Sequence, residues 1–466
     1  MPTAESTAAS MDGSAASTSL LTDMYELTML QGALASGAAA RRSVFELFGR
    51  RLPGSRRFGV VAGTGRLLDA IEAFTFTPSQ IDFLHRAEVV NDETLDFLRG
   101  YRFTGTIRGY AEGECYFAGS PLLTVEGTFA EACILETLAL SIYNYDCAVA
   151  SAASRMTIAA HGRPCVDFGA RRAHEQAAVA AARASVVGGF VGTSNLEAGL
   201  LYGIPTVGTS AHSFTLLHDT EEDAFAAQVA SLGPSTTILV DTYDITTGVE
   251  RAVKAARAAG GELGAVRLDS GDLVAEAFKV RAQLDALGAT STRITVTNDL
   301  DEHAIAALGA APVDSYGVGT KLVTGSGRPT AALVYKLVER EGADGTMEEV
   351  AKFSSGGKST VGGRKWAGRI LNSEGTAAEE LVVSSSSQDQ GLSALSQAGA
   401  RPLQVLLVDE GRIIEEHRGK EALSAAAERH RASRAELPYD AWRLSDGESA
   451  LPTRHVDLDG RGATRR

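Results

Sequence analysis

TTILVDTYDITTGVERAVKAARAAGGELGAVRLDS, residues 236–270, is the stretch that decides the predicted fold. It opens and closes with a short apolar run, and between the two runs lies a segment with apolar residues at helical spacing. A strand, a helix and a second strand in this order are typical of βα units, in which the two strands lie parallel.

The same alternation continues on both sides of this stretch. Ala-rich helical patterns separate most of the apolar runs, so we expect a parallel sheet. About seven strands favour a closed or nearly closed barrel, with an open doubly wound sheet as the alternative architecture. The expected strands are residues 165–169, 189–193, 204–209, 236–242, 265–270, 293–298 and 314–320.

The chain has 466 residues, which exceeds the roughly 100–200 residues of a typical domain. The alternation is limited to the middle of the chain. Mixed strand and helix patterns precede it, and a Gly-rich, charged segment follows it. Residues 455–466 are expected to fray. We expect a disordered Ala/Ser/Thr-rich tail at 1–18, an N-terminal α/β domain at 19–150, a barrel at 151–340 and a C-terminal segment at 341–466.

Composition excludes several classes of function. The formal charge of −14 argues against non-specific binding to nucleic acid, although a few local Arg or Lys can still bind a small anion. No apolar run reaches the roughly 18 residues of a membrane span, and the N-terminus lacks the pattern of a secretory signal. The four cysteines have no metal-binding spacing, so we expect reduced thiols and a cytoplasmic protein.

Charged or ionisable residues follow almost every expected strand, where βα barrels carry their chemistry. Asp, Asn, Ser and Thr at such points can also be helix N-caps, but caps do not call for Arg, Lys or His. The residues are Arg171, Arg172, His212, Asp241, Asp244, Arg267, Asp269, Asp272, Asn298, Asp299, Gly319, Thr320 and Lys321.

AVRLDSGDL, residues 265–273, is the most specific of these places. Arg267 and Asp269 lie on one face of the strand because successive side chains alternate. Burying them is costly unless they are paired or bind a ligand. Asp269 and Asp272 beside a guanidinium suit either a sugar diol or hydrated Mg²⁺. The alternative is a structural Arg267–Asp269 ion pair.

Two further stretches complete the pattern. SYGVGTKLVTGSGRP, residues 315–329, spaces glycines so that backbone N–H groups could hold phosphate oxygens, with Gly319 and Thr320 at the strand end. GIPTVGTSAHSF, residues 203–214, surrounds His212 with small residues, although a single His is more often structural. Together these features predict binding of a phosphorylated sugar and a second, negatively charged substrate.

The motifs resemble those of the nicotinate phosphoribosyltransferases, most of all the bacterial enzymes. The matching stretches span residues 20 to 340 in the family's order, and the chain departs from the pattern at Met24, Glu26 and His174-Glu175. The stretches are LLTDMYELTM, DFGARRAHE, GFVGTSNLEAGLLYGIPTVGTSAHSF, VRLDSGDL, and YGVGTKLVTGSGRP with VYKLVE.

This resemblance implies an irregular (βα) barrel of the type II phosphoribosyltransferase kind, with a smaller α/β domain formed by the N- and C-terminal segments. It implies that nicotinate and phosphoribosyl pyrophosphate give nicotinate mononucleotide and pyrophosphate, the first step of NAD salvage from nicotinate. It also implies ATP as a co-substrate with Mg²⁺, transient phosphorylation of His212, and a homodimer with the active site at the subunit interface.

The roles implied for single residues follow the same motifs. Arg267 and Thr209 would bind nicotinate, and Tyr25 would stack on its ring from the neighbouring subunit. Arg171 would lie near nicotinate and the phosphates. Gly319 and Thr320 would bind the 5′-phosphate. Asp269 and Asp272 would contact the ribose hydroxyls or magnesium-pyrophosphate.

Three other functions stay open from the sequence. A sister enzyme would use nicotinamide, which has no carboxylate, or quinolinate, which has two. A barrel lyase would use Lys321 as a Schiff base, which needs an apolar pocket around the amine. A nucleotide sensor would bind the same ligands without turnover.

Overall fold

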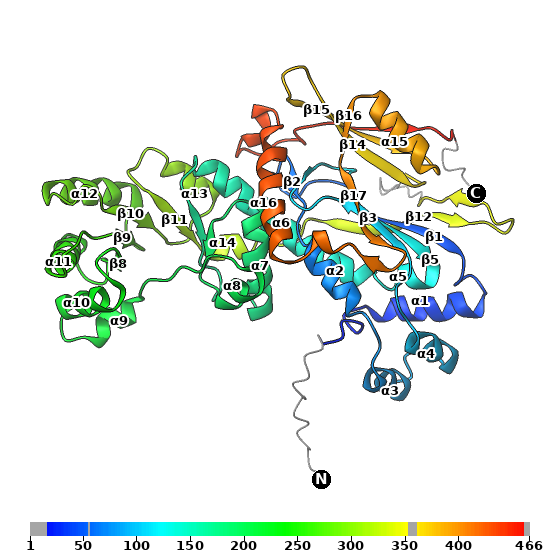
Figure 1. The fold of residues 1–466 in the computed structure, drawn as a ribbon, viewed down its shortest axis with the longest axis horizontal. Coiled ribbons are helices and arrows are strands. Elements are labelled where there is room, and N and C mark those ends of the chain that lie inside the picture. The colour runs from blue at the N-terminus through cyan, green and yellow to red at the C-terminus, as the bar shows by residue number, and fades with distance from the viewer. Residues whose placement is uncertain (1–15, 55, 353–360, 461–466) are drawn as a thin grey trace, which may run out of the picture.

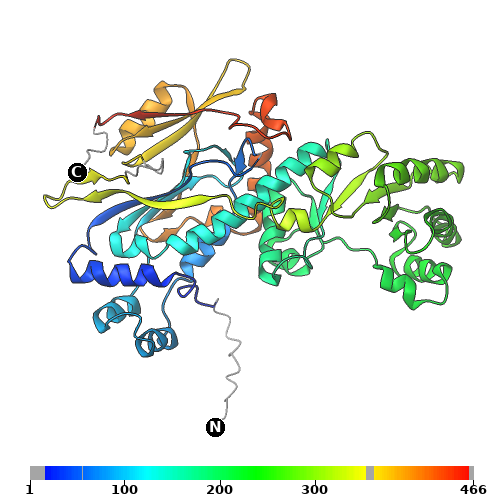
Figure 2. The same cartoon turned by 180° about the vertical axis from the view of Figure 1, so that it is seen from behind.

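The computed structural model describes residues 16–54, 56–352 and 361–460. The chain forms an antiparallel region and a parallel-sheet region, which lie side by side and are joined through a long helix, α6 (Glu136–Ala159) (Figures 1 and 2). Of the tail expected at 1–18, residues 1–15 lie outside the described residues. From Ser17 on, the chain is hydrogen-bonded, because the Ser17 hydroxyl donates to the Thr75 carbonyl oxygen at 2.6 Å.

The antiparallel region is built on a sheet that mixes strands from distant parts of the chain, in the order β13-β12-β1-β5-β3-β17-β18. Strands β1, β5 and β3 form its centre. Its elements are α1 (Met24–Ala35), β1 (Arg42–Gly49), α2 (Thr64–Glu72), α3 (Pro78–Arg86), α4 (Asp92–Arg99), β3 (Thr106–Tyr110), β5 (Pro121–Thr128), α5 (Phe129–Cys133), β12 (Leu333–Glu341), β13 (Met347–Glu349), β17 (Gln404–Asp409) and β18 (Arg412–Ile413).

A second sheet, in the order β16-β14-β15-β19, covers this region near the C-terminus. Its last strand corrects the expectation of a frayed end, because His455 to Asp457 pair in parallel with β15; residues 461–466 lie outside the described residues. Backbone pairing satisfies the polar groups that a frayed end would leave to water. The elements are β14 (Lys365–Leu371), β15 (Ala377–Ser384), α15 (Gln388–Gln397), β16 (Ala400–Pro402) and β19 (Thr453–Asp457), beside the short pair β2 (Gly59–Val60) and β4 (Cys115–Tyr116).

The parallel-sheet region contains a curled six-stranded sheet in the order β7-β6-β11-β10-β9-β8, so the predicted α/β character is confirmed. Its strands are β6 (Cys165–Asp167), β7 (Gly192–Thr193), β8 (Thr237–Leu239), β9 (Ala265–Leu268), β10 (Arg293–Val296) and β11 (Ser315–Val318). Its helices are α7 (Glu175–Val187), α8 (Leu196–Tyr202), α9 (His212–Leu217), α10 (Glu221–Leu232), α11 (Ile245–Ala258), α12 (Leu273–Ala286), α13 (Glu302–Ala307) and α14 (Thr320–Val323).

The strand expected at residues 204–209 is not a strand of this sheet. It contributes one parallel bridge, Thr206 to Thr193, and within the described part of the chain β7 and β8 do not pair. Pro205 has no N–H group to donate, and Gly208 follows closely, so the segment cannot sustain a row of hydrogen bonds. The sheet is therefore open at this point, and the loop that carries His212 leaves from the opening.

A buried ion pair joins the two regions. Arg183 of α7 donates to both carboxylate oxygens of Glu112, at 2.6 and 2.8 Å, and the Gly63 N–H donates to the same carboxylate at 2.7 Å. Burial alone would raise the pKa of Glu112, but Arg183 holds it below its usual value. A Cβ at Gly65 would stand 2.8 Å from the Arg183 guanidinium, so the glycine makes room for the pair.

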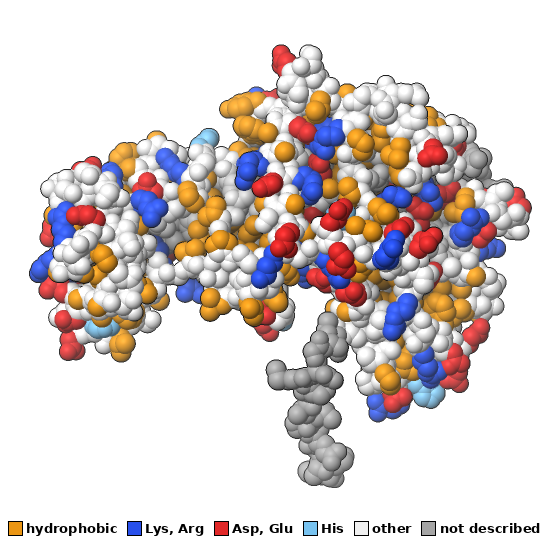
Figure 3. Space-filling view, in the orientation of Figure 1, with side chains coloured by type: hydrophobic (Ala, Val, Ile, Leu, Met, Phe, Trp, Pro, Cys, Tyr) orange, Lys and Arg blue, Asp and Glu red, His pale blue; other side chains and the backbone are white. Residues whose placement is uncertain are grey.

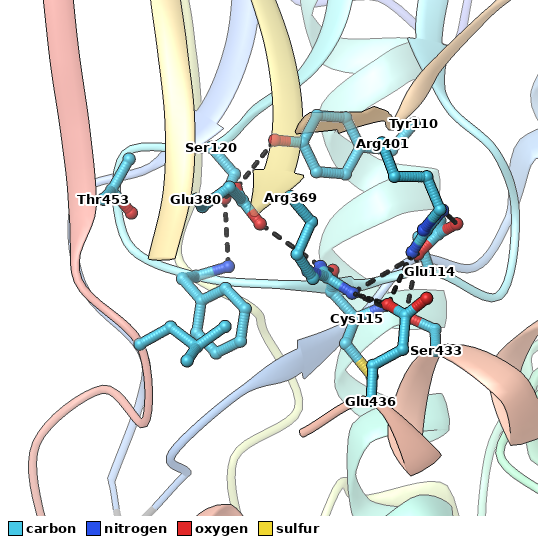
Figure 4. A network of polar contacts seen from close by, with 12 residues as sticks. Tyr110, Glu114, Cys115, Ser120, Arg369, Glu380, Arg401, Ser433, Glu436 and Thr453 are labelled. Atoms are coloured by element: carbon cyan, nitrogen blue, oxygen red, sulfur yellow. Dashed lines mark hydrogen bonds and ion pairs between the residues drawn. The ribbon is translucent and has the colours of Figure 1, made fainter. Parts of the chain in front are cut away.

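A second buried network ties the C-terminal sheet to α16 (Gly419–Ala435) (Figure 4). The Arg369 guanidinium, fully buried on β14, lies 3.2 Å from Glu380 and 3.2 Å from Glu436, and it donates to Ser433 at 2.9 Å. Glu380 also accepts from the Tyr110 hydroxyl at 2.7 Å. The network connects strands and a helix that are far apart in the sequence.

None of the helices in the described ranges is long and apolar enough to cross a membrane. All four cysteines are free and buried, and burial raises the pKa of each thiol, to about 12 for Cys115.

Replacing Arg369 with Met should lower the free energy of unfolding by about 3–5 kcal/mol, because it leaves Glu380 buried without its cation. The matched control is Arg454→Met, which removes a half-exposed pair with Glu379 across β15 and β19 and should cost about 1 kcal/mol or less. Chemical denaturation measures both. Equal stability of the two variants would contradict a structural role for the network.

Acid should destabilise the protein through His430. Its ring is buried between Ser154 and Gly113, and burial, with nearby Arg434, lowers its pKa from 6.5 to about 3. Between pH 6.5 and about pH 3, His430 is protonated in the unfolded chain and neutral in the folded chain. The free energy of unfolding therefore falls as the pH falls, by up to about 1.4 kcal/mol per pH unit for this group.

Denaturation of wild type and His430→Gln at about pH 7, 6 and 5 checks this expectation. The variant should be less stable at pH 7 but should lose less stability on acidification. Parallel pH dependence of the two proteins would exclude His430 as the titrating group.

Candidate active site

A cavity of about 440 Å³ lies at the carboxyl ends of the parallel strands. Loops after β6, β7, β9, β10 and β11 line it, together with the loop that leaves the open side of the sheet. The lining residues are Phe168, Ala170, Arg171, Arg172, Ser194, Val207, Gly208, Thr209, Ser210, Ala211, His212, Arg267, Asp269, Thr297, Asn298, Asp299, Gly317, Gly319 and Thr320. The expected strand-end chemistry thus converges on one place.

Arg267 connects β9 to the loop before α9. Its guanidinium donates to the Thr209 hydroxyl at 2.6 Å and to the Ser210 carbonyl oxygen at 3.1 Å, while its Nε is buried without a partner. Burial lowers the pKa of Arg267, against the nearby Asp269 and Asp241, but an Arg remains a cation. The structural Arg267–Asp269 ion pair considered from the sequence does not form among the described residues. The cation therefore remains available to an anionic ligand.

Two aspartates at neighbouring strand ends have different tasks. Asp241 is buried and accepts from the Asp269 N–H at 2.8 Å and from the Ser270 hydroxyl at 2.7 Å, so it holds the turn after β9. Asp269 accepts from the Thr297 hydroxyl on one oxygen, while its other oxygen lies 4.0 Å from His212 Nε2. Asp269 therefore presents one carboxylate oxygen to the cavity.

His212 is the first residue of α9, and its two ring nitrogens have different surroundings. Nδ1 lies 3.1 Å from the Thr242 hydroxyl, a hydrogen bond that fixes the ring plane. Nε2 points toward Asp269, and the side chain remains 42% exposed. One nitrogen is thus held and the other is open to a ligand.

The loops after β6, β10 and β11 form the opposite wall of the cavity. Asn298 and Asp299 have positive φ angles of 96° and 37°, a strained backbone that tends to occur at binding sites. Gly169 allows the loop after β6 to approach α14 (Thr320–Val323), because a Cβ there would stand 2.2 Å from the Val323 side chain. Gly319 precedes the one-turn helix α14, which begins at Thr320.

Besides the buried Asp241, four residues singled out from the sequence do not line the cavity. Asp244 is exposed and caps α11 by accepting from the Thr247 N–H at 2.8 Å. Asp272 is exposed, caps α12 by accepting from the Ala275 N–H at 3.2 Å, and does not line the cavity. Lys321 does not line the cavity either. Tyr25 is on α1 in the antiparallel region, far from the cavity of its own chain (Figure 1). Burial raises the pKa of Tyr25 to about 12, with smaller contributions from Glu136 and Glu26.

The sequence reading gave no role to Thr242 and Thr297. Both lie at the carboxyl ends of expected strands, 236–242 and 293–298, so the strand-end rule could have found them, but Thr at such points is ordinary in helix caps. Asp241 was recognised only as one of many strand-end charges. Its buried Oδ1 has no partner among the described residues.

The site offers few protein ligands for a metal. Among the residues that the structure describes, no three His, Cys, Asp or Glu side chains converge to hold an ion. Mg²⁺ commonly takes one or two carboxylates and completes its shell with substrate phosphates and water. The free oxygen of Asp269 fits such a site, whereas the capping role of Asp272 does not.

Comparisons with known proteins agree with this site. The model of the nicotinate phosphoribosyltransferase (NAPRTase) N-terminal domain matches residues 20–144, and that of the nicotinate phosphoribosyltransferase family matches residues 164–353. Nicotinate phosphoribosyltransferase pncB1 of Mycobacterium tuberculosis (strain ATCC 25618 / H37Rv) is 52% identical over 445 residues, which are 94% of this chain and 95% of the relative.

More distant relatives support the same assignment. The Bacillus subtilis nicotinate phosphoribosyltransferase is 38% identical over 363 residues, 76% of this chain and 74% of the relative. The crystal structure of human nicotinic acid phosphoribosyltransferase superposes with a TM-score of 0.79 at 25% identity, covering 93% of this chain and 97% of that one.

Proposed function

Because the chain belongs to the nicotinate phosphoribosyltransferase family, we propose that its cavity transfers the phosphoribosyl group of phosphoribosyl pyrophosphate to nicotinate. The products are nicotinate mononucleotide and pyrophosphate, and the reaction is the first step of NAD salvage from nicotinate. The observation that carries the proposal is Arg267, a half-buried cation that lines the cavity and has no carboxylate partner among the described residues.

Arg267 and Thr209 bind nicotinate in this proposal. The guanidinium would hold the carboxylate by charge-assisted hydrogen bonds, which leaves the pyridine nitrogen directed into the cavity. That nitrogen carries no proton at neutral pH, so attack on C1 of the ribose needs no general base. Positioning and electrostatics supply the catalysis.

The opposite wall binds the sugar phosphate. Backbone N–H groups at Gly319 and Thr320 would hold the 5′-phosphate, and Arg171 would stabilise negative charge on the departing pyrophosphate. Asp269 faces the ribose hydroxyls. Mg²⁺, when bound between Asp269 and the substrate phosphates, would neutralise part of the charge that develops on the leaving group.

His212 couples the reaction to ATP, which places the enzyme in the ligase class. Nε2 would attack the γ-phosphorus of ATP, forming an N–P bond as the bond to the ADP oxygen breaks; water later releases phosphate. The small residues Ser210, Ala211 and Ser213 leave space for the γ-phosphate. With the proton on Nδ1, His212 donates it to the Thr242 hydroxyl 3.1 Å away, which leaves the lone pair on Nε2 as the nucleophile.

We further propose a homodimer in which α1 of one subunit covers the cavity of the other and Tyr25 stacks on nicotinate. Two exposed apolar groups support this arrangement, one at α1 and one around α8 and α9 (Figure 3). Exposed apolar patches of this kind mark protein interfaces. The groups are Leu20, Leu21, Met24, Tyr25 and Met29, and Leu196, Leu200, Leu201, Val207, Leu216 and Leu217.

The finer architecture follows from the same family. We propose that residues 151–340, apart from β12, form the irregular barrel of a type II phosphoribosyltransferase, and that residues 19–150 and 341–466 form the other domain together with β12, which pairs with β1. Pairing of β17 with β3 supports this division, because it joins the two chain ends in one sheet. Four buried free thiols are consistent with a cytoplasmic enzyme.

The alternatives have less support. Lys321 lies outside the cavity lining, so a Schiff-base lyase would lack its amine at the site. Nicotinamide has no carboxylate for Arg267. Quinolinate would need cations for two carboxylates as well as for the phosphates, and Arg171, Arg172 and Arg267 are the only Lys or Arg residues among those that line the cavity.

Replacing Arg267 with Ala should lower kcat/KM for nicotinate by about 10- to 100-fold, the value of a charge-assisted hydrogen bond. Steady-state kinetics with nicotinate, nicotinamide and quinolinate measure the change. Arg257→Ala, which removes an exposed pair with Glu262 on α11, is the matched control and should keep wild-type kinetics. Unchanged use of nicotinate by Arg267→Ala would refute the assigned role.

Replacing His212 with Ala should abolish ADP formation and remove most nicotinate mononucleotide at low substrate, while wild type makes the two products in step. Both products are followed together after addition of ATP, magnesium, nicotinate and phosphoribosyl pyrophosphate. His218→Ala, which changes a neighbouring ring outside the cavity lining, should keep the coupling. Continued ADP formation by His212→Ala would remove His212 as the phosphorylated residue.

A further inference from the structure

A second cavity, of about 460 Å³, lies at the other end of β6. Its residues 157–162 precede β6, whereas the catalytic loop 168–172 follows that strand. The end of α16 and the short helix η2 (Tyr439–Trp442) close its other side. The lining residues are Thr157, Ile158, His161, Gly162, Arg434, Tyr439, Trp442 and Arg443.

The charge of this second cavity is opposite to that of the chain. The formal charge of the whole protein is −14, yet the lining carries two Arg and one His and no acidic side chain. Asp440, outside the lining, lies 2.7 Å from Arg443, and both side chains of that pair are more than half exposed. A local cationic surface on an acidic protein selects anionic ligands.

Arg434 is the cation that most clearly lacks a counter-charge. Its guanidinium donates to the Thr157 hydroxyl at 2.8 Å and to the Ser154 carbonyl oxygen at 3.3 Å, both neutral acceptors. Within the described ranges it forms no ion pair, and burial lowers its pKa. Withdrawing a guanidinium from water without a counter-ion is costly, so an anion in the cavity would recover that energy.

The aromatic wall points to the rest of the ligand. Tyr439 is 77% exposed and Trp442 is 39% exposed, and their ring centroids lie 6.2 Å apart. Large exposed rings beside cations are typical of sites that stack a planar ring and bind a phosphate attached to it. The cavity volume falls within the roughly 300–1,000 Å³ of small-molecule sites.

We propose that this second cavity binds a nucleotide, with the base stacked on Trp442 and the phosphate at Arg434 and Arg443. The Tyr439 ring, inclined by 47° to that of Trp442, would lie against the edge of the base. The site is separate from the catalytic cavity, and the proposal does not depend on the reaction catalysed there. Arg443 would exchange its exposed partner Asp440 for the phosphate, while Arg434 is already held in place.

Tryptophan fluorescence tests the proposal directly. The chain has two Trp residues, and Trp366 is only 3% exposed, so a ligand at this cavity should act mainly on Trp442. AMP is the probe, since it has a base and a phosphate but no γ-phosphate for His212. Saturable quenching by AMP, absent in Trp442→Phe, is the expected result. Adenosine and ribose 5-phosphate should bind at least about tenfold more weakly, because each lacks one half of the ligand.

Two variants on the exposed rim locate the binding. Arg443→Glu and Tyr439→Ser should each weaken AMP binding at least about tenfold and keep wild-type nicotinate kinetics, since neither residue contacts the catalytic cavity. Arg267→Ala should keep AMP binding in the fluorescence assay.

Several results would overturn the proposal. Quenching that survives Arg443→Glu and Tyr439→Ser, or that disappears with Arg267→Ala, would place AMP elsewhere. Absence of quenching at AMP concentrations that would saturate a site with a Kd of about 1 mM would exclude a nucleotide site. A change of sedimentation coefficient in Arg443→Glu or Tyr439→Ser without a change in AMP binding would identify this face as a contact between subunits.

Discussion

The buried pair of Arg183 and Glu112 is the interaction on which the arrangement of the two regions depends. It is bidentate, nearly inaccessible to water, and completed by the N–H of Gly63. A pair of this kind tolerates no sliding, since any shift leaves a charge buried and unpaired. The ion pair holds α7 in place. The loop that precedes α7 carries Arg171, which lines the catalytic cavity. Arg66 and Asp146, 2.6 Å apart, reinforce the same junction between α2 and α6.

The carboxylates at the strand ends have two different roles in the catalytic cavity: some hold the loops in place, and one faces the cavity. Asp167 and Asp241 are buried, and they hold backbone and hydroxyl groups of the turns after β6 and β9. Asp269 stands on a turn held in this way and keeps one oxygen directed to the cavity. Asp167 and Asp241 thus accept the hydrogen bonds that hold the loops in shape. The side chains of Asp269, Arg267 and His212 are then free to contact a ligand.

Net charge and local charge have separate consequences in this protein. The formal charge of the whole chain is −14, while each of the two cavities carries Arg side chains that suit phosphates and carboxylates. In the catalytic cavity the Arg267 guanidinium donates a hydrogen bond to the Thr209 hydroxyl. In the second cavity the Arg434 guanidinium donates one to the Thr157 hydroxyl. A neutral partner orients a guanidinium without neutralising it, so the cation can still attract an anion.

The sequence by itself determined six of the seven expected parallel strands and most of the charged residues that line the candidate cavity. Strand–helix alternation is a local pattern, and it predicted Arg171, His212, Arg267 and Asp269 near strand ends, where they line one cavity; the role of Thr209 came from the resemblance. The roles of Thr242 and Thr297 were not predictable, because hydroxyl residues at these points serve equally well as caps.

Only the tertiary structure decided the rest. It made Asp272 a cap, opened the sheet between β7 and β8, and paired β17 with β3 and β19 with β15. It also brought Arg434 to the end of α6, where the second cavity forms. These contacts join residues far apart in the chain. Their free energy comes from burial and pairing in the folded protein, and no local periodicity of the sequence encodes it.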